Sequence, residues 1–233
     1  MTTQGGRVRG RWRSRTDARG VTTTYATFRG IPFAAPPVGE LRFAPPASAL
    51  GWDGVRDAAE FGPTPQRESP YDPPRIPEPS IPGDDVLSVN VTTPDPSSAA
   101  GLPVLVWIHG GGFVGGSPAS PWYVGQSFAR DGVVTATLSY RLGFEGFGWM
   151  EDAVPNRGAL DWIAGLEWIQ RNIASFGGDP SRVTIAGQSA GGAAVMRLLT
   201  LPAADHLFAR AMAISPADAS ASVDRAREAA RAV

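Results

Sequence analysis

The stretch VTIAGQSAGGAAVMRLL, residues 183–199, places a serine between a short strand and a helix. Its first four residues are apolar or β-branched and predict a buried strand, and the residues after Ser189 predict a helix. Gly187 and Gly191 fit a turn that pinches two backbones together, because a Cβ atom at either position would clash. A Gly-x-Ser-x-Gly sequence in this setting is typical of a nucleophile elbow.

Two interpretations of Ser189 follow from this stretch. In the first, its hydroxyl projects at the carboxyl edge of a sheet, where the first amides of the following helix face a developing oxyanion. In the second, Ser189 is an ordinary N-cap whose side chain accepts a hydrogen bond from the helix backbone. The local sequence leaves both interpretations open.

A second glycine-rich stretch, VWIHGGGFVGGS at residues 106–117, follows another apolar strand pattern. Three consecutive glycines leave backbone N–H groups free to converge on one ligand atom, as in the oxyanion holes of lipases and esterases. The alternatives are a flexible loop or a phosphate cradle. Nucleotide binding is disfavoured because the stretch lacks a Lys-Ser/Thr ending and no helix opens directly after it.

Short strand patterns alternate with helical patterns after residue 85. Strands are predicted over Val86–Val91, Pro103–Ile108, Val133–Ser139, Arg182–Ala186 and Arg210–Ile214, and helices over Trp122–Asp131, Gly158–Ser175 and Ala190–Thr200. Trp162, Leu166, Ile169 and Ile173 form a helical stripe that faces a sheet. This alternation predicts an α/β fold with a central, mostly parallel sheet covered by helices on both faces.

The amino-terminal part has a different pattern. Residues 6–12 (GRVRGRW) and 21–34 (VTTTYATFRGIPFA) alternate as strands of an antiparallel hairpin, with a turn near Asp17–Gly20. Residues 62–83 contain eight prolines, which predicts an extended surface loop that either connects elements or covers a cleft. No repeat or linker divides the chain, so residues 1–233 are interpreted as part of one domain.

Composition narrows the possible partners. The 233 residues carry a net charge of −1, so neither nucleic acid nor an anionic membrane surface is an expected partner. Cysteine is absent, which excludes thiolate catalysis and thiolate metal sites, and no cofactor or metal is predicted. No signal-like or membrane-spanning apolar run is found, so a cytoplasmic location is expected, with secretion left open.

Several long segments resemble one known family. The segments FRGIPFAAPPVGELRF, LPVLVWIHGGGF, SYRLGFEGF and NRGALDWIAGLEWIQRNIASFGGDPSRVTIAGQSAGG are similar to the amino-terminal half of type B carboxylesterases. That family has the α/β-hydrolase fold and includes cholinesterases and some lipases. The resemblance implies hydrolysis of a small carboxylic ester through an acyl-enzyme.

The resemblance also implies site residues and departures. It assigns Ser189 as the nucleophile, and the backbone amides of Gly111, Gly112 and Ala190 as the oxyanion hole. Val86 stands where many members have a loop-closing cysteine. Three further positions near the site, Ser139, Trp162 and Gln188, replace the usual Asn, Gln and Glu.

The base and acid that activate such a serine are not evident in the sequence. Of its two histidines, His109 is implied to be structural, and His206 follows the predicted helix after Ser189, which carries it away from the nucleophile. The family order places the acid and histidine far downstream. The chain is therefore expected to be a fragment whose partner is the missing carboxyl-terminal half. Asp218, Asp224 and Glu228 are expected to be solvated charges.

A second function is also compatible with the sequence. Some hydrolase-like proteins are non-catalytic and serve in protein interactions. Such proteins typically lack the serine of the elbow, so the presence of Ser189 favours the esterase. Apolar residues near the glycine loop, Phe113 and Trp122 among them, indicate either an uncharged substrate or ordinary core packing.

Overall fold

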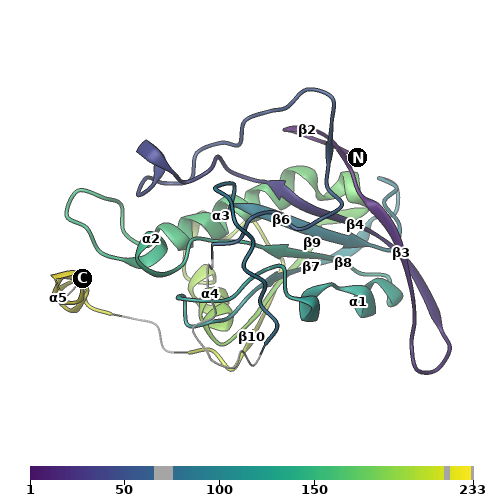
Figure 1. Cartoon of the computed structure of the whole chain (residues 1–233). Coiled ribbons are helices and arrows are strands. Elements are labelled where there is room, and N and C mark those ends of the chain that lie inside the picture. Colours follow the sequence, from purple (N-terminus) through teal and green to yellow (C-terminus); the bar gives the residue numbers. More distant parts are fainter. Residues whose placement is uncertain (66–75, 218–220, 232–233) are drawn as a thin grey trace.

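The computed structural model describes residues 1–65, 76–217 and 221–231, which are built around a seven-stranded sheet (Figure 1). The strand order is β10-β9-β7-β8-β6-β4-β3. The strands are β3 (Arg11–Thr16), β4 (Thr22–Pro32), β6 (Ser88–Thr93), β7 (Leu102–Ile108), β8 (Val134–Leu138), β9 (Gly178–Gln188) and β10 (Arg210–Ile214). Pairing is parallel from β8 through β7 and β9 to β10, and antiparallel among β8, β6, β4 and β3. The predicted α/β class is confirmed.

Helices lie on both faces of this sheet (Figure 1). They are α1 (Gln126–Arg130), α2 (Gly143–Phe147), α3 (Arg157–Asn172), α4 (Ala190–Leu198) and α5 (Val223–Arg231), with 3-10 turns η1 (Gly39–Leu41), η2 (Pro121–Tyr123), η3 (Ile173–Phe176) and η4 (Pro202–Ala204). Gly125, just before α1, lies against Thr135, whereas Gly165 of α3 lies against Leu138. Thr135 and Leu138 are three residues apart on β8, so α1 and α3 cover opposite faces.

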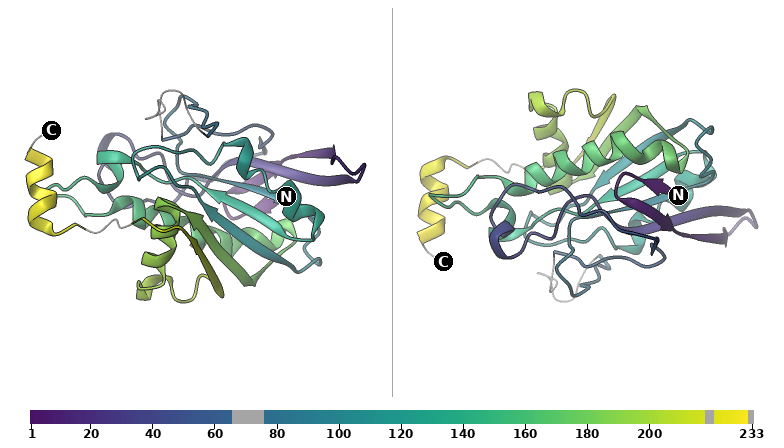
Figure 2. Two further views of the ribbon diagram at one scale, coloured as in Figure 1. Left: turned by 90° about the horizontal axis from the view of Figure 1, so that it is seen from below. Right: turned by 90° about the horizontal axis from the view of Figure 1, so that it is seen from above.

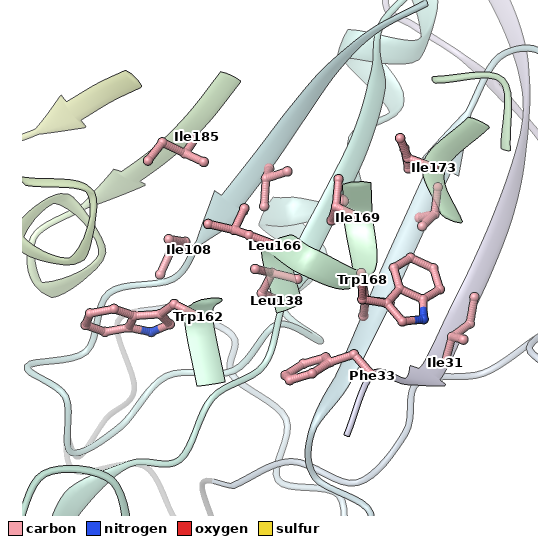
Figure 3. Packing of buried hydrophobic residues seen from close by; sticks show 14 of the residues in the cluster. Ile31, Phe33, Ile108, Leu138, Trp162, Leu166, Trp168, Ile169, Ile173 and Ile185 are labelled. Atoms are coloured by element: carbon pink, nitrogen blue, oxygen red, sulfur yellow. The ribbon is translucent and has the colours of Figure 1, made fainter. Parts of the chain in front are cut away.

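The core lies between α3, α4 and the sheet. All four residues of the predicted stripe, from Trp162 to Ile173, are buried, and Figure 3 shows them among Ile108, Leu138 and Ile185 of the strands. Burial of such apolar side chains is the main favourable term in folding. The helical periodicity read from the sequence was therefore correct.

Several predicted elements have other bounds in the structure. The helix expected over Gly158–Ser175 ends at Asn172 and continues as η3, and the strand expected over Arg182–Ala186 is the longer β9. The helix expected over Trp122–Asp131 is split into η2 and α1, because Gly125 between them has φ of +74°, outside the right-handed helical region. A Cβ atom at Gly125 would lie 2.6 Å from Thr135 Cβ, so the chain passes too close to β8 for a continuous helix. The strand expected over Val86–Val91 begins instead at Ser88 and continues to Thr93.

The amino-terminal hairpin is also shifted. β3 and β4 pair from Arg11 with Thr27 to Thr16 with Thr22, and the Asp17 side chain accepts hydrogen bonds from two amides of the turn. Residues 6–9 instead form β2 (Gly6–Arg9) in a separate three-stranded sheet with β1 (Thr2–Thr3) and β5 (Val55–Asp57). The break falls at Gly10, where a Cβ atom would meet the Phe28 ring at 2.6 Å.

The described ends of the proline-rich loop are held together without a disulfide. Residues 62–65 and 76–83 contain no helix or strand, and residues 66–75 lie outside the described part. The Thr64 amide donates to the Ile81 carbonyl at 3.0 Å, and the Ile81 amide donates to Thr64 Oγ1 at 2.9 Å. These bonds close the loop just before Val86, the position where the family resemblance implies a cysteine.

β10 is the last strand at one edge of the sheet, and its large apolar side chains are exposed. Met212 and Ile214 are 54% and 39% accessible to solvent. α5 lies apart from the sheet (Figure 2). The Asp224 side chain on α5 is 95% accessible, and Glu228 is also exposed; Asp218 lies outside the described residues. Among the residues described, every helix is too short or too polar to cross a lipid bilayer.

Candidate active site

Ser189 occupies a strained turn between β9 and α4. Its backbone has φ of 57° and ψ of −120°, a combination that few residues other than glycine adopt. The Ser189 amide donates to the Ile214 carbonyl at the end of β10 at 3.0 Å. The Ser189 carbonyl accepts from the Ala193 amide of α4 at 2.9 Å. The turn is therefore fixed on both sides by main-chain bonds.

The N-cap interpretation of Ser189 is wrong. Its side chain makes no capping hydrogen bond to α4, and within the described part of the chain no hydrogen bond uses its Oγ. The residue is half-buried, so Ser189 is neither enclosed in the core nor fully exposed to solvent. Because a serine in a costly conformation has no local structural task, the conformation indicates a functional constraint.

The two glycines of the elbow are where close packing requires them. A Cβ atom on Gly187 would lie 2.5 Å from the Gly191 carbonyl carbon and 2.8 Å from the Ile108 oxygen. A Cβ atom on Gly191 would overlap the Ile108 carbonyl oxygen and lie 2.9 Å from that of His109. These contacts are with backbone, which cannot rotate away. The steric reason read from the sequence is confirmed.

The strain at Ser189 predicts a gain in stability when it is relieved. We expect Ser189→Gly to raise the free energy of unfolding by about 1 kcal/mol relative to Ser189→Ala, because only glycine adopts this conformation without a Cβ clash. Both variants lack the hydroxyl, so the difference between their free energies of unfolding reports only the cost of the strained backbone. Urea unfolding of the two proteins measures it, and equal stabilities would contradict the strain.

The glycine loop after β7 has an unusual backbone. Gly111, Gly112 and Phe113 have φ of 110°, 63° and 62°, and Phe113 is the only one of the three with a side chain. The amides of Val114 and Gly115 donate back to the Gly111 carbonyl at 3.1 and 2.9 Å. The Phe113 carbonyl accepts from the Gly143 amide at 2.7 Å. The loop is thus ordered by its own hydrogen bonds and by α2.

The glycine loop lies against the serine turn. A Cβ atom on Gly110 would be 2.7 Å from the Gln188 carbonyl oxygen and 3.5 Å from Ser189 Cβ. Among the described residues, no hydrogen bond uses the amides of Gly111, Gly112 or Ala190 as donors. Unused backbone donors therefore flank the serine on the glycine loop and at the start of α4. Such donors can stabilise a developing oxyanion.

His109 lies behind this loop in a structural position. Its ring is buried, stacks on Tyr140 with centroids 4.4 Å apart, and lies with Nδ1 2.8 Å from the Gly110 carbonyl oxygen. Because a carbonyl only accepts, Nδ1 carries a proton in this contact. The Tyr140 hydroxyl donates to the His109 carbonyl at 2.8 Å. Burial lowers the pKa of His109 to about 4.

This pKa predicts how stability depends on pH. The unfolded chain takes up the His109 proton near the usual value of 6.5, whereas the folded chain takes it up only near pH 4. Between these values the unfolded state binds more protons, so stability is greatest above pH 6.5 and falls by about 3 kcal/mol as the pH drops to 4. Urea unfolding between pH 6.5 and pH 4 should show that the free energy of unfolding falls more steeply for wild type than for His109→Gln. His206→Gln is the control, and an equal loss in all three proteins would contradict the prediction.

His206 lies far from Ser189, beyond the carboxyl end of α4, whereas Ser189 directly precedes the amino-terminal end of that helix. The His206 side chain is exposed and follows η4. The nearby Ala209 amide donates to the Val183 carbonyl at 2.8 Å, in the first half of β9, whereas Ser189 follows the last residue of β9. The six residues from Val183 to Ser189 span roughly 20 Å in an extended strand. Neither histidine of the chain is placed beside Ser189.

A cavity of about 420 Å³ opens beside the elbow, on the face of the sheet that carries α1. Gln188 and Ile214 border it on the strand side, and Trp122 and Phe128 border it on the α1 side. Phe113 does not line it; its ring packs on Phe147 and Trp162, with centroids 4.8 and 5.8 Å away. Of the two aromatic residues considered from sequence, Trp122 lines this cavity and Phe113 belongs to the core.

Sequence reasoning missed two features of the site. The first is the end of β10, because the Ile214 carbonyl and the Ala217 amide both bond to the backbone of Ser189. A parallel strand next to the elbow was predicted, but its contacts with the turn leave no signature in the sequence. The second is the support that α2 gives to the glycine loop. A short helix of five residues has too little periodicity to be recognised.

Comparisons with known proteins show the family of this chain. The chain matches the carboxylesterase family over residues 1–233 and belongs to that family. It is 43% identical to the fumonisin B1 esterase of Sphingopyxis macrogoltabida, covering 84% of this chain and 38% of that protein. It is 41% identical to the para-nitrobenzyl esterase of Bacillus subtilis, covering 97% and 45%.

Solved structures give the same result. The chain superposes on the juvenile hormone esterase of Manduca sexta with a TM-score of 0.91 at 34% identity, covering 99% of this chain and 44% of that one. It superposes on a carboxylesterase of Geobacillus stearothermophilus with a TM-score of 0.76 at 42% identity, covering 91% of this chain and 42% of that one. The fold is therefore that of the α/β-hydrolases, and the chain spans less than half the length of these relatives.

Proposed function

We propose that this chain is the amino-terminal part of one α/β-hydrolase domain that hydrolyses carboxylic esters through a serine nucleophile. Ser189 Oγ attacks the acyl carbonyl, and the amides of Gly111, Gly112 and Ala190 receive the oxyanion. Collapse of this tetrahedral intermediate expels the alcohol and leaves an acyl-serine, which water then hydrolyses to the carboxylic acid and free Ser189. The observation that carries this proposal is the strained, uncapped Ser189 beside three unused backbone donors.

Family membership supports the reaction type. The relatives named above are esterases, and the juvenile hormone esterase structure has a compound covalently attached. Ester hydrolysis by this route needs a base for the serine proton and an acid that orients the base. His109 is buried with Nδ1 bonded to Gly110, and His206 lies far from the elbow. We therefore propose that a histidine and a carboxylate from outside these 233 residues complete the site.

The lining of the neighbouring cavity supports an uncharged substrate. Its walls are mainly aromatic and aliphatic, with the side chain of Gln188 as a polar group next to the serine. An apolar wall favours an uncharged acyl or alcohol group, because an isolated charge would lose its hydration there. Without the base, the oxyanion donors and binding alone accelerate the reaction about 10³-fold over water. These 233 residues alone are expected to be a very poor esterase.

Phenylboronic acid tests the proposal without requiring the base. The serine oxygen bonds to the trigonal boron and loses its proton to solvent, which gives an anionic tetrahedral adduct that resembles the intermediate of ester hydrolysis. We expect a tetrahedral boron signal by ¹¹B NMR with the 233-residue chain and none with Ser189→Ala. Ser181→Ala is the matched control, since Ser181 is an exposed serine whose hydroxyl is bonded to Asp179. A signal that persists in Ser189→Ala would refute the role of Ser189, and the absence of any wild-type adduct would favour the non-catalytic alternative.

A further inference from the structure

Arg157, the first residue of α3, is completely buried and is not used by the proposed reaction. Its guanidinium donates to four backbone carbonyls: those of Phe144 at 2.9 Å and of Glu145, Gly148 and Val154 at 2.8 Å. No salt bridge joins it to a carboxylate among the described residues. A buried cation without a counterion lowers the stability of the fold unless its donors are satisfied. Loss of these charge-assisted hydrogen bonds is therefore strongly unfavourable.

The four carbonyls belong to one small unit. Phe144 and Glu145 lie in α2, Gly148 directly follows it, and Val154 lies near the end of the loop that leads to α3. α2 has five residues, too few to be stable as an isolated helix. Arg157 therefore fixes α2 at its carboxyl end, and it closes the loop after α2 by bonding both of its ends.

α2 supports the glycine loop with residues from both of its ends, Gly143 and Phe147. The Gly143 amide donates to the Phe113 carbonyl at 2.7 Å, and the Phe147 ring packs on the Phe113 ring with centroids 4.8 Å apart. Phe113 follows Gly112 directly and has φ of 62°, which a non-glycine residue adopts only when its surroundings impose it. α2 therefore contributes to holding Phe113 in this conformation, together with Trp162 of α3, whose ring centroid lies 5.8 Å from that of Phe113.

We propose that Arg157 is a positioning residue for the oxyanion hole, acting through α2 and Phe113 on the amides of Gly111 and Gly112. This inference rests on the proposed function, but its physical link does not require catalysis. Without the guanidinium, α2 loses the bonds at its carboxyl end. The Gly143 contact weakens, and Phe113 can relax toward negative φ. The two glycine amides then no longer converge beside Ser189.

Hydrogen exchange of the 233-residue chain tests this link directly. We expect Arg157→Met to speed exchange of the Val114, Gly115 and Gly143 amides at least about tenfold, in line with the loss of hydrogen bonds to a charged group. Binding of phenylboronic acid should weaken by a similar factor. Arg171→Met is the matched control, because Arg171 is an exposed arginine on the same helix whose one salt bridge within the described residues is to Glu167 at 3.6 Å.

The outcomes separate three cases. Unchanged exchange at Val114, Gly115 and Gly143, with faster exchange only at Gly148, would overturn the inference, because Arg157 would then hold only its own loop. Absence of boronate binding by wild type would refute the proposed function, while the exchange data would still report on the link. Arg157→Lys keeps the positive charge but lacks the planar guanidinium, so we expect exchange of the same amides to speed up less than in Arg157→Met. If the methionine variant does not fold, unchanged exchange in the lysine variant refutes the inference.

Discussion

Replacing Asp161 by asparagine is expected to lower the free energy of unfolding by about 3–5 kcal/mol, because it leaves a buried guanidinium without its counterion. The side chains of Arg141 and Asp161 are 3% and 0% accessible. Arg141 donates to the Asp161 carboxylate from its backbone amide at 2.9 Å, from Nε at 2.9 Å and from a terminal nitrogen at 2.7 Å. This pair ties α3 to the chain directly after β8.

The matched control for Asp161→Asn is Glu167→Gln on the same helix. Glu167 pairs with Arg171 at 3.6 Å, and both side chains are nearly half exposed. Such a pair contributes less than about 1 kcal/mol. Urea unfolding of both variants measures the difference. A loss at Asp161 no larger than that at Glu167 would show that the buried pair is not a main constraint on α3.

Substitution of Gly191 by alanine is expected to disrupt the serine turn. The added methyl group would overlap the Ile108 carbonyl oxygen and lie 2.9 Å from the His109 oxygen, and both are main-chain atoms of the segment that leads into the glycine loop. Overpacking of this kind costs about 1–3 kcal/mol. Because α4 must move away from β7, Ser189 moves away from the glycine loop as well. Boronate binding should therefore be lost.

Gly51→Ala is the control for Gly191→Ala. The nearest atom to a Cβ at Gly51 is the Gly5 oxygen at 3.4 Å, an ordinary contact, so stability and boronate binding should stay close to wild type. The comparison uses urea unfolding and ¹¹B NMR on both proteins. Full stability and full boronate binding in Gly191→Ala would contradict the close backbone approach at the elbow.

The regular parts of the fold could be predicted from the sequence because their periodicity is long. The strand Arg210–Ile214 has the predicted bounds, and α3 and α4 begin within one residue of their predicted starts. Two of the errors fall at glycines. Gly125 and Gly10 each lie against a neighbouring strand, and such a contact depends on tertiary packing that a local pattern does not contain. Because Gly10 lies against β4, the predicted first strand of the hairpin is divided there into β2 and β3.

The candidate site was predictable to a different degree. Gly-x-Ser-x-Gly after one strand and three glycines after another predicted a nucleophile elbow and a loop of free backbone donors, and the family resemblance implied the roles of Ser189, Gly111, Gly112 and Ala190. The choice between nucleophile and N-cap needed coordinates, since both place serine at a helix start. The role of Arg157 was hidden for a related reason. Its partners are backbone carbonyls, which carry no side-chain signature in the sequence.

A crystal structure of the 233-residue chain with phenylboronic acid tests the central claim most directly. The account predicts a bond between Ser189 Oγ and boron, with one boronate oxygen about 3 Å from the amide nitrogens of Gly111, Gly112 and Ala190. An unmodified Ser189, or an adduct whose oxygens all point to solvent more than about 4 Å from these nitrogens, would contradict it.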